Sequence, residues 1–322
     1  MTVRCEDLGH NLYVIDGYDL GLPNRTGVYI FNEERITILE TGPSMSLPYI
    51  KQGMKELGRT LDEVDYIIVT HVHLDHAGGA GLLLTECPNA KVIIHPRGAR
   101  HLIDPSRLIK GAKAVYKEKF EELFEPVLPI PKDRVVVLED NSTLTISSER
   151  TLTFLDTPGH AAHHYSIYDR ESEGVFTGDT IGIQYPDAKK MNKDIYIPST
   201  SPNQFDPDAM LSSLERIMAL EPKRIYFGHY GMCEDPKEVE KQIKMWLPRF
   251  LSIGKVSFDQ HHTEERLSET LFNEISEHYQ LDHSEDLSNL TAFLKMDASV
   301  SSMGIIHYFA QQEKAKNSAA EK

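Results

Sequence analysis

Short apolar runs rich in β-branched and aromatic residues recur along the first part of the chain, with Gly, Pro and Asn between them. Runs of this kind, bounded by turn residues, are typical of β-strands. They predict strands over residues 12–15, 27–31, 35–39, 66–70 and 91–95. Apolar positions at helical spacing predict helices over residues 47–57, 79–86 and around 118–124.

A second set of apolar runs follows Pro131. It predicts strands over residues 134–138, 144–146, 151–155, 165–168, 174–177 and 224–228, with a helix over residues 208–220. The two sets have a similar order of elements, but no residue-level repeat indicates a duplication. Strands and helices that alternate inside a β-rich frame favour an α/β (α+β) fold in which helices cover packed sheets.

The pattern becomes purely helical after about Pro236, with helices predicted over residues 239–251, 263–279 and 287–296. Residues 311–322 are rich in Lys, Glu, Ala and Ser, which predicts a frayed helix or a loose tail. The expected domains are therefore 1–235, a helical extension 236–310 and a tail 311–322. The extension either packs onto the first domain, or caps the active site or forms a homodimer contact.

Composition narrows the class of protein. The 322 residues are 40% hydrophobic and 26% charged, with a net charge of -15 that disfavours nucleic acid as a partner. Three cysteines, Cys5, Cys87 and Cys233, show no paired spacing, which favours a reducing compartment. We expect no membrane span, because no run of about 20 apolar residues occurs. With no apolar signal segment at the start, the expected location is the cytoplasm.

Potential metal ligands gather directly after the predicted strand 66–70. Three imidazoles and one carboxylate, His71, His73, Asp75 and His76, fall within six positions. Imidazole and carboxylate together suit zinc, iron or manganese. A His-rich surface loop is the alternative interpretation of the same residues.

Three more predicted strands run into turns that carry a potential ligand. The ligand candidates are His160, Asp179 and His229, and a glycine immediately precedes each of them. Glycine at such a place is expected where the backbone turns sharply or approaches a site closely. Each of these three segments alone is weak evidence, because a lone histidine after a strand is more often structural.

Taken together, these seven residues resemble the metallo-β-lactamase superfamily, a large group of αββα metallohydrolases. The resemblance covers residues 10–235. The segments 40–43 (Glu-Thr-Gly-Pro) and 157–164 (Thr-Pro-Gly-His-Ala-Ala-His-His) look most similar to a poorly characterised branch of bacterial and archaeal hydrolases. The implied fold is two mixed sheets packed face to face with helices outside and the metal site at the sheet edge.

The resemblance implies two divalent metal ions, Zn²⁺ in the first place with Fe or Mn as alternatives. The first ion would be held by His71, His73 and His160, the second by Asp75, His76 and His229, and Asp179 would bridge them. Two ions about 3.5 to 4 Å apart share a hydroxide and lower its pKa to about neutral. Our mechanistic hypothesis is that this bridging hydroxide attacks the substrate while Asp75 orients it and handles its proton. The structural alternative for Asp75 is a helix N-cap.

The predicted function is therefore a metal-dependent hydrolase of a small-molecule ester, lactone, thioester or phosphodiester. The alternative is a mononuclear iron oxidoreductase similar to persulfide dioxygenases, with one ion on His71, His160 and Asp179. Acyl-homoserine lactonases of the superfamily carry a tyrosine three positions after the bridging aspartate, where this chain has Gly182. The loop 181–205 also contains Tyr185 and Tyr196, either of which could donate a hydrogen bond to an oxyanion or simply pack. The motifs do not encode the substrate.

Overall fold

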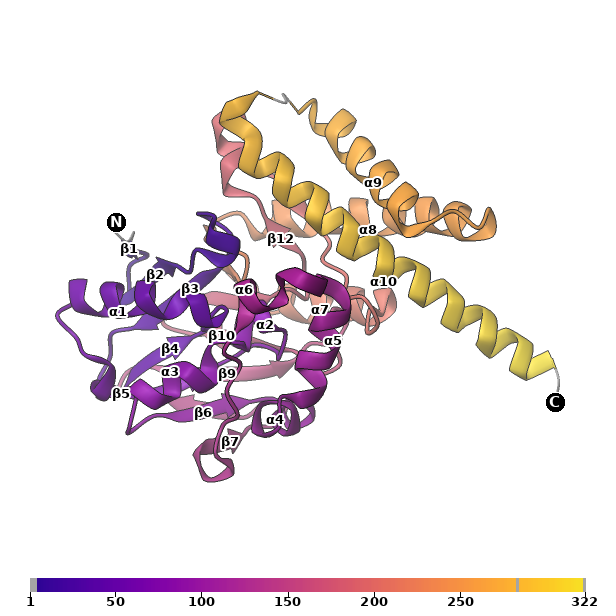
Figure 1. Ribbon diagram of the computed structural model, residues 1–322. Helices are drawn as coiled ribbons and strands as arrows, with labels where there is room; N and C mark the ends of the chain where they lie inside the picture. The colour runs from indigo at the N-terminus through magenta and orange to yellow at the C-terminus, as the bar shows by residue number, and fades with distance from the viewer. Residues whose placement is uncertain (1–4, 282–283, 321–322) are drawn as a thin grey trace. The chain divides into compact units, whose positions relative to one another are not determined.

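The computed structural model describes residues 5–281 and 284–320 (Figure 1). The chain divides into two compact units, and each is described by itself. The first unit comprises Met1–Thr157, His163–Gly178 and Ile217–Pro236. The second comprises Pro158–Ala162, Asp179–Arg216 and Lys237–Lys322.

Two mixed sheets form the first unit. Within the described residues, the larger sheet has seven strands in the order β1-β2-β3-β4-β5-β6-β7, antiparallel from β1 to β4 and parallel from β4 to β7. These strands are β1 (Cys5–Asp7), β2 (Leu12–Asp16), β3 (Gly27–Phe31), β4 (Ile36–Leu39), β5 (Val64–Ile68), β6 (Lys91–Ile94) and β7 (Val135–Val137).

The second sheet has six strands within the described residues, in the order β15-β14-β11-β10-β9-β8. Only the β11–β14 pair among its neighbours is parallel. The strands are β8 (Thr143–Thr145), β9 (Thr151–Asp156), β10 (Tyr165–Asp169), β11 (Gly174–Gly178), β14 (Arg224–Phe227) and β15 (Met232–Cys233). The prediction of two mixed sheets is confirmed.

The period-two alternation of β3 explains how the layers pack. Val28 and Ile30 belong to one apolar cluster, whereas Tyr29 and Phe31 belong to another. Successive side chains of a strand point to opposite faces of its sheet. The Tyr29 ring meets the ring of Phe176 from β11 edge to face at 5.0 Å between centroids, so the second cluster joins the two sheets.

The first cluster lies under helices on the other face of the larger sheet, and includes Ile50 and Met54 of α1 and Leu83 of α3. Figure 1 shows these helices along that sheet. The helices of this unit are α1 (Leu47–Glu56), α2 (Leu74–Ala77), α3 (Ala80–Glu86), α4 (Pro96–Ile103), α5 (Ser106–Tyr116) and α6 (Phe120–Phe124).

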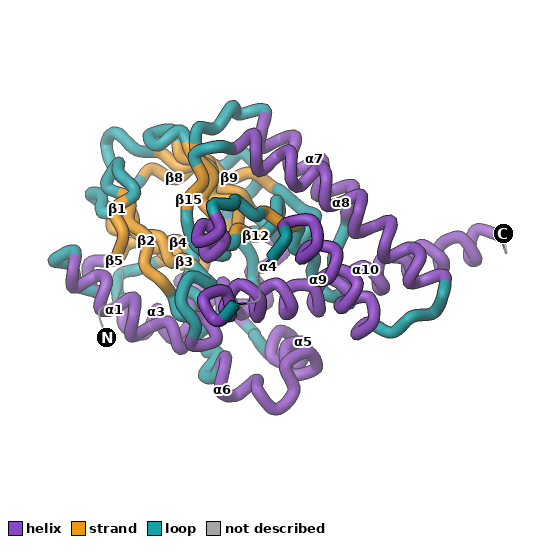
Figure 2. The backbone as a smooth tube through the Cα atoms, turned by 90° about the horizontal axis from the view of Figure 1, so that it is seen from above, coloured by secondary structure: helices purple, strands orange, loops and turns teal. Residues whose placement is uncertain are grey.

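The second unit is mainly helical. Its helices are α7 (Pro207–Met218), which runs to the boundary with the first unit, α8 (Pro236–Asp259), α9 (Glu264–Tyr279) and α10 (Ser288–Ala320). A short antiparallel pair, β12 (Ile183–Gln184) and β13 (Tyr196–Ile197), lies in the loop before α7. Helices α9 and α10 lie along each other, as both views of the backbone show (Figure 2). No helix in the described part of the chain is long and apolar enough to cross a membrane.

The predicted elements agree with the structure in most places, and the differences are local. The strand predicted over residues 66–70 ends at Ile68, and α4 and α5 occupy a region where only residues 118–124 were predicted to be helical. Residues 311–320, expected to fray or form a tail, continue α10, and the last two residues lie outside the described part. The division into domains at residue 235 stays a prediction.

A buried ion pair provides a test of the first unit. Arg150 and Asp169 are 1% and 0% exposed, and Arg150 Nη2 lies 2.5 Å from Asp169 Oδ2. We expect Asp169→Asn to lower the free energy of unfolding by about 3 kcal/mol, because it removes the fully buried counter-charge of this guanidinium and leaves Glu33, 3.1 Å from Arg150 Nη1, to balance it. The matched control, Glu86→Gln, removes the exposed pair with Lys51 and should cost less than about 1 kcal/mol. Urea unfolding measures both, and equal losses would contradict the assignment.

Candidate metal centre

The His-rich segment spans the turn between β5 and α2. The N–H of Val69 still donates to Ile93 of β6, at 3.3 Å, and α2 begins after His73, which occupies the N-cap position. Asp75 and His76 therefore stand in the first turn of a four-residue helix. The alternative role of Asp75 as a helix N-cap is wrong, because the cap position belongs to His73.

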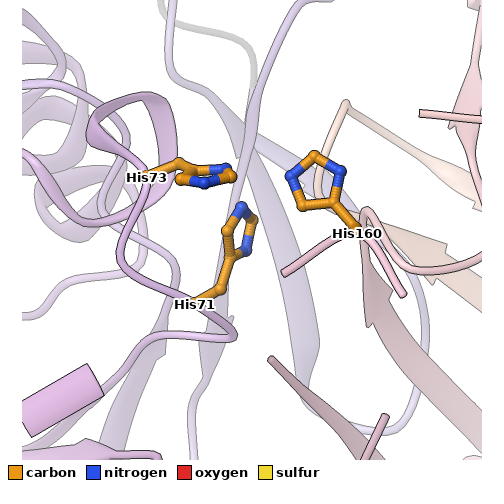
Figure 3. A group of neighbouring side chains, drawn as sticks. All are labelled: His71, His73 and His160. Atoms are coloured by element: carbon orange, nitrogen blue, oxygen red, sulfur yellow. The ribbon is translucent and has the colours of Figure 1, made fainter. Parts of the chain in front are cut away.

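The structure brings the predicted ligands together in three groups within the described residues. In each group, one nitrogen or oxygen atom per residue lies within 4.8 Å of the others. The first group is drawn in Figure 3, where the three imidazole rings point toward one another. The first group is His71, His73 and His160; the second is His71, His76 and Asp179; the third is Asp75, His76 and His229.

A chain of hydrogen bonds fixes the orientation of His71. The Thr70 hydroxyl donates to the carboxylate of Glu40 and lies 3.0 Å from Nδ1 of His71. Since the hydroxyl proton is used on Glu40, the Thr70 oxygen accepts from Nδ1–H. The lone pair of the imidazole is then on Nε2, which is the tautomer that a metal ligand needs.

His229 and His160 are held in the same tautomer by backbone carbonyl groups. Nδ1 of His229 lies 3.0 Å from the carbonyl oxygen of Arg25, and Nδ1 of His160 lies 3.0 Å from that of Ser199. A carbonyl oxygen only accepts, so both Nδ1 atoms carry the proton. In each case Nε2 is the atom left with a lone pair.

Asp75 differs from its neighbours in exposure. Its Oδ2 lies 3.6 Å from Nε2 of His76 and 3.6 Å from Nε2 of His229. The Asp75 side chain is 22% exposed, whereas those of His76 and His229 are 1% and 3% exposed. The carboxylate therefore both belongs to the third group and remains open to solvent.

Two of the glycines that precede ligand candidates are required by close approach, as the sequence predicted. A Cβ on Gly178 would lie 2.6 Å from the Thr70 hydroxyl oxygen, and the residue has a φ of +46°. A Cβ on Gly228 would lie 2.6 Å from Cε1 of His76. Both positions let a strand end run directly against the His-rich segment.

The remaining histidines lie outside the three groups of the described residues. His164 is buried just before β10, and its Nδ1 lies 3.1 Å from the Thr157 hydroxyl. His95 caps α4 and pairs with Asp156 at 3.0 Å, and burial lowers the pKa of His95. His283 lies outside the described residues.

Some residues of the site were not identified from the sequence. Glu40 was recognised only as part of a motif, yet it is buried at a φ of 64° and its Oε2 lies 3.7 Å from Nδ1 of His76. Asp19 is also buried, and its Oδ1 has no hydrogen-bond partner among the described residues. Their loop positions carry no periodic signal, so only the folded chain reveals them.

The donor set fits a divalent cation. Imidazole nitrogens and carboxylate oxygens are the ligands that zinc, iron and manganese accept. Buried groups of this kind are costly when they converge with nothing to satisfy them.

Two sheets packed face to face, with histidines and aspartates clustered after strand ends, define a class of metal-binding two-sheet proteins. The chain belongs to the metallo-beta-lactamase superfamily, because the model of that family matches residues 22–229. This fold implies divalent metal binding, and enzymes of the family act on small-molecule substrates.

Several proteins are similar to this chain. The metallo-beta-lactamase fold-containing protein ST1585 of Sulfurisphaera tokodaii is 28% identical over 242 residues, which cover 74% of this chain and 85% of that protein. Its crystal structure matches with a TM-score of 0.66 over 92% of this chain and 98% of that chain, at 24% identity. An N-acyl homoserine lactonase of Bacillus thuringiensis is 26% identical over 55% of this chain and 60% of the lactonase.

The Thr70 hydroxyl offers a test of the orientation of His71. We expect Thr70→Val to weaken zinc binding about 10- to 100-fold, because Nδ1–H of His71 loses its acceptor. The matched control is Thr37→Val in β4, since Thr37 is equally buried and its hydroxyl donates to the carbonyl of Arg35, which belongs to none of the three groups. Competition with a chromogenic chelator measures both affinities. Equal zinc affinities for the two variants would contradict a positioning role for Thr70.

Proposed function

We propose that this protein is a dinuclear metal-dependent hydrolase of a small-molecule ester, thioester, lactone or phosphodiester. The observation that carries the proposal is the common tautomer of His71, His160 and His229. Each gives its Nδ1 proton to a fixed oxygen of the protein and keeps its lone pair on Nε2. Structural histidines have no need of this shared arrangement.

The assignment of ligands follows the three groups. His71, His73 and His160 would hold one divalent ion, Asp75, His76 and His229 the other, and Asp179 would lie between them. When bound, such ions lower the pKa of coordinated water and polarise the substrate oxygen. Zinc is the first choice, and iron and manganese suit the same donors.

Asp75 is the residue best placed to move a proton. Its carboxylate is the most exposed member of the third group and lies 3.6 Å from Nε2 of two imidazoles. A carboxylate at this place accepts a proton from the attacking water and passes it to solvent or to the leaving group. His71, His160 and His229 cannot do this, because their Nδ1–H groups are held in hydrogen bonds and their Nε2 atoms would bind the metal ions.

The loop after Asp179 argues against the lactonase type of oxyanion donor. Gly182 has a φ of +99°, and a Cβ there would lie 2.5 Å from the carbonyl oxygen of Ile197. A tyrosine therefore does not fit at this position. The Tyr185 hydroxyl is also engaged, since it donates to Asp297 at 2.7 Å. The similarity to a lactonase and, at 24% identity, to an atrochrysone carboxyl ACP thioesterase supports hydrolysis of an acyl compound in general.

Substitution of two proposed ligands tests the proposal. We expect Asp75→Asn to lower kcat at least about 100-fold, because the proton acceptor is lost. His160→Ala should also lower the metal content, whereas His262→Ala, outside the three groups, should change neither. The assay is a panel of lactones, thioesters, β-lactams and phosphodiesters, with metal quantified in every preparation.

The same preparations separate the alternatives. Full activity in both Asp75→Asn and His160→Ala would reject the ligand assignment. One iron per chain, with oxygen consumption on glutathione persulfide and no hydrolysis, would replace the hydrolase by a persulfide dioxygenase-like oxidoreductase.

A further inference from the structure

Asp19 is a buried acidic residue that none of the ligand groups includes. It lies in a short 3-10 helix, η1 (Asp19–Gly21), between β2 and β3, and is only 2% exposed. Its Oδ1 has no hydrogen-bond partner within the described part of the chain. A carboxylate removed from water without a partner is costly, so a residue of this kind calls for a functional explanation.

The backbone around Asp19 is strained on both sides. Tyr18 has a φ of 48° and Leu20 a φ of 59°, although neither is glycine. Other contacts hold this conformation in place. The Asp16 carboxylate accepts the N–H groups of Tyr18 and Asn24 at 3.0 and 2.8 Å, and the Tyr18 ring stacks on Tyr49 at 4.5 Å between centroids. Strain that the surroundings maintain in this way is characteristic of functional sites.

The loop that contains Asp19 is also hydrogen-bonded to the segment that carries His229, a member of the third group. The carbonyl oxygen of Arg25, at the end of the loop, accepts a hydrogen bond from Nδ1 of His229 at 3.0 Å. The N–H of Gly27 donates to the carbonyl oxygen of Gly228, also at 3.0 Å. Burial, followed by the charge of Asp75, raises the pKa of Asp19 to about 6, and the positive charge of Arg25 opposes this rise, as do His229 and His76 when they are protonated. The carboxylates of Asp19 and Asp75 therefore repel each other, as two negative charges do when no cation lies near them.

We infer that the Asp19 carboxylate, which is not itself a ligand, strengthens the binding of a divalent cation by Asp75, His76 and His229. This inference rests on the proposed function. Neutral imidazoles contribute no charge, so these three ligands bring a single negative charge to an ion of charge +2, and the charge of Asp179 would be shared with the other ion. Asp19 supplies a second negative charge from a low-dielectric position, where its effect is strong. It acts through charge and not as a ligand, since it is not a member of the group.

The alternative is that Asp19 only balances the buried guanidinium of Arg25. The two roles differ in the metal-free protein. A structural counter-charge stabilises the fold without metal, so its loss lowers Tm. An acidic group that awaits a cation destabilises the metal-free fold, because its Oδ1 is buried with no hydrogen-bond partner among the described residues and its charge is repelled by Asp75.

The experiment uses the full chain freed of metal, with Zn²⁺ and then Mn²⁺ alone as probes in isothermal titration calorimetry. The variants are Asp19→Asn, which keeps the shape of the side chain, and Asp19→Ser as a second substitution. The control Asp62→Asn removes one exposed negative charge from the same unit. We expect both Asp19 variants to bind the second equivalent about tenfold more weakly, with the first equivalent within about twofold of the wild type. We expect Tm of the metal-free variants to equal or exceed that of the wild type.

Each other outcome has a distinct meaning. If the Asp19 variants bind the second cation as tightly as the wild type does, or as tightly as the Asp62→Asn control does, the inference is overturned and the proposed function stands. If their metal-free Tm falls, with the second affinity unchanged, Asp19 is a structural partner of Arg25. A wild type that takes up no second cation overturns the two-ion proposal itself.

Discussion

The site depends on the hydrogen bonds that the Nδ1–H groups of its histidines donate. An imidazole that binds a metal through Nε2 is oriented when its Nδ1–H group donates a hydrogen bond to an acceptor in a fixed position. The Thr70 hydroxyl and the carbonyl of Arg25 provide such acceptors in the first unit. These acceptors come from the end of β5 and the loop before β3, so elements distant in the chain must fold correctly before any ligand is oriented.

This requirement explains several costly features of the chain. Glu40 adopts a φ of 64° and is buried, but its carboxylate there receives the Thr70 hydroxyl, which frees the Thr70 oxygen to accept from His71. Gly178 and Gly228 contribute no side chain to the core, and this absence of a Cβ lets two strand ends approach the His-rich segment. The packed aromatic core between the sheets supplies the stability that offsets these costs.

Sequence patterns predicted the sheets well and identified the candidate ligands that the structure brings into groups, because both depend on local signals. Alternating apolar residues mark β3, and the spacing of His71, His73, Asp75 and His76 follows directly from the turn after β5. Strands of two or three residues, such as β12 and β15, are too short for periodicity to reveal them. Residues 311–320 continue α10 because Gln, Glu, Lys and Ala are good helix formers, a propensity that outweighs their polar composition.

Tertiary contacts decided the features that the sequence could not predict. Asp19 and Glu40 stand in loops, and their burial depends on segments far along the chain. Tyr185 could be placed on a loop from the sequence, but its bond to Asp297 joins residues 112 positions apart. A motif lists side chains that can perform chemistry, whereas the acceptors and charges around them become visible only when the chain is folded.

Helices α8 and α10 hold the loop that carries Ser199 in place within the second unit. Gln242 of α8 accepts the N–H of Tyr196 at 2.9 Å, and Asp297 of α10 accepts the Tyr185 hydroxyl at 2.7 Å. The loop held by these two bonds carries Ser199, whose carbonyl accepts the Nδ1 proton of His160. Because a carbonyl on an unsupported loop would be a poor anchor for a ligand, α8 and α10 serve the site by fixing this loop. Helices α8 and α10 thus help to orient His160, although none of their described residues belongs to the three groups.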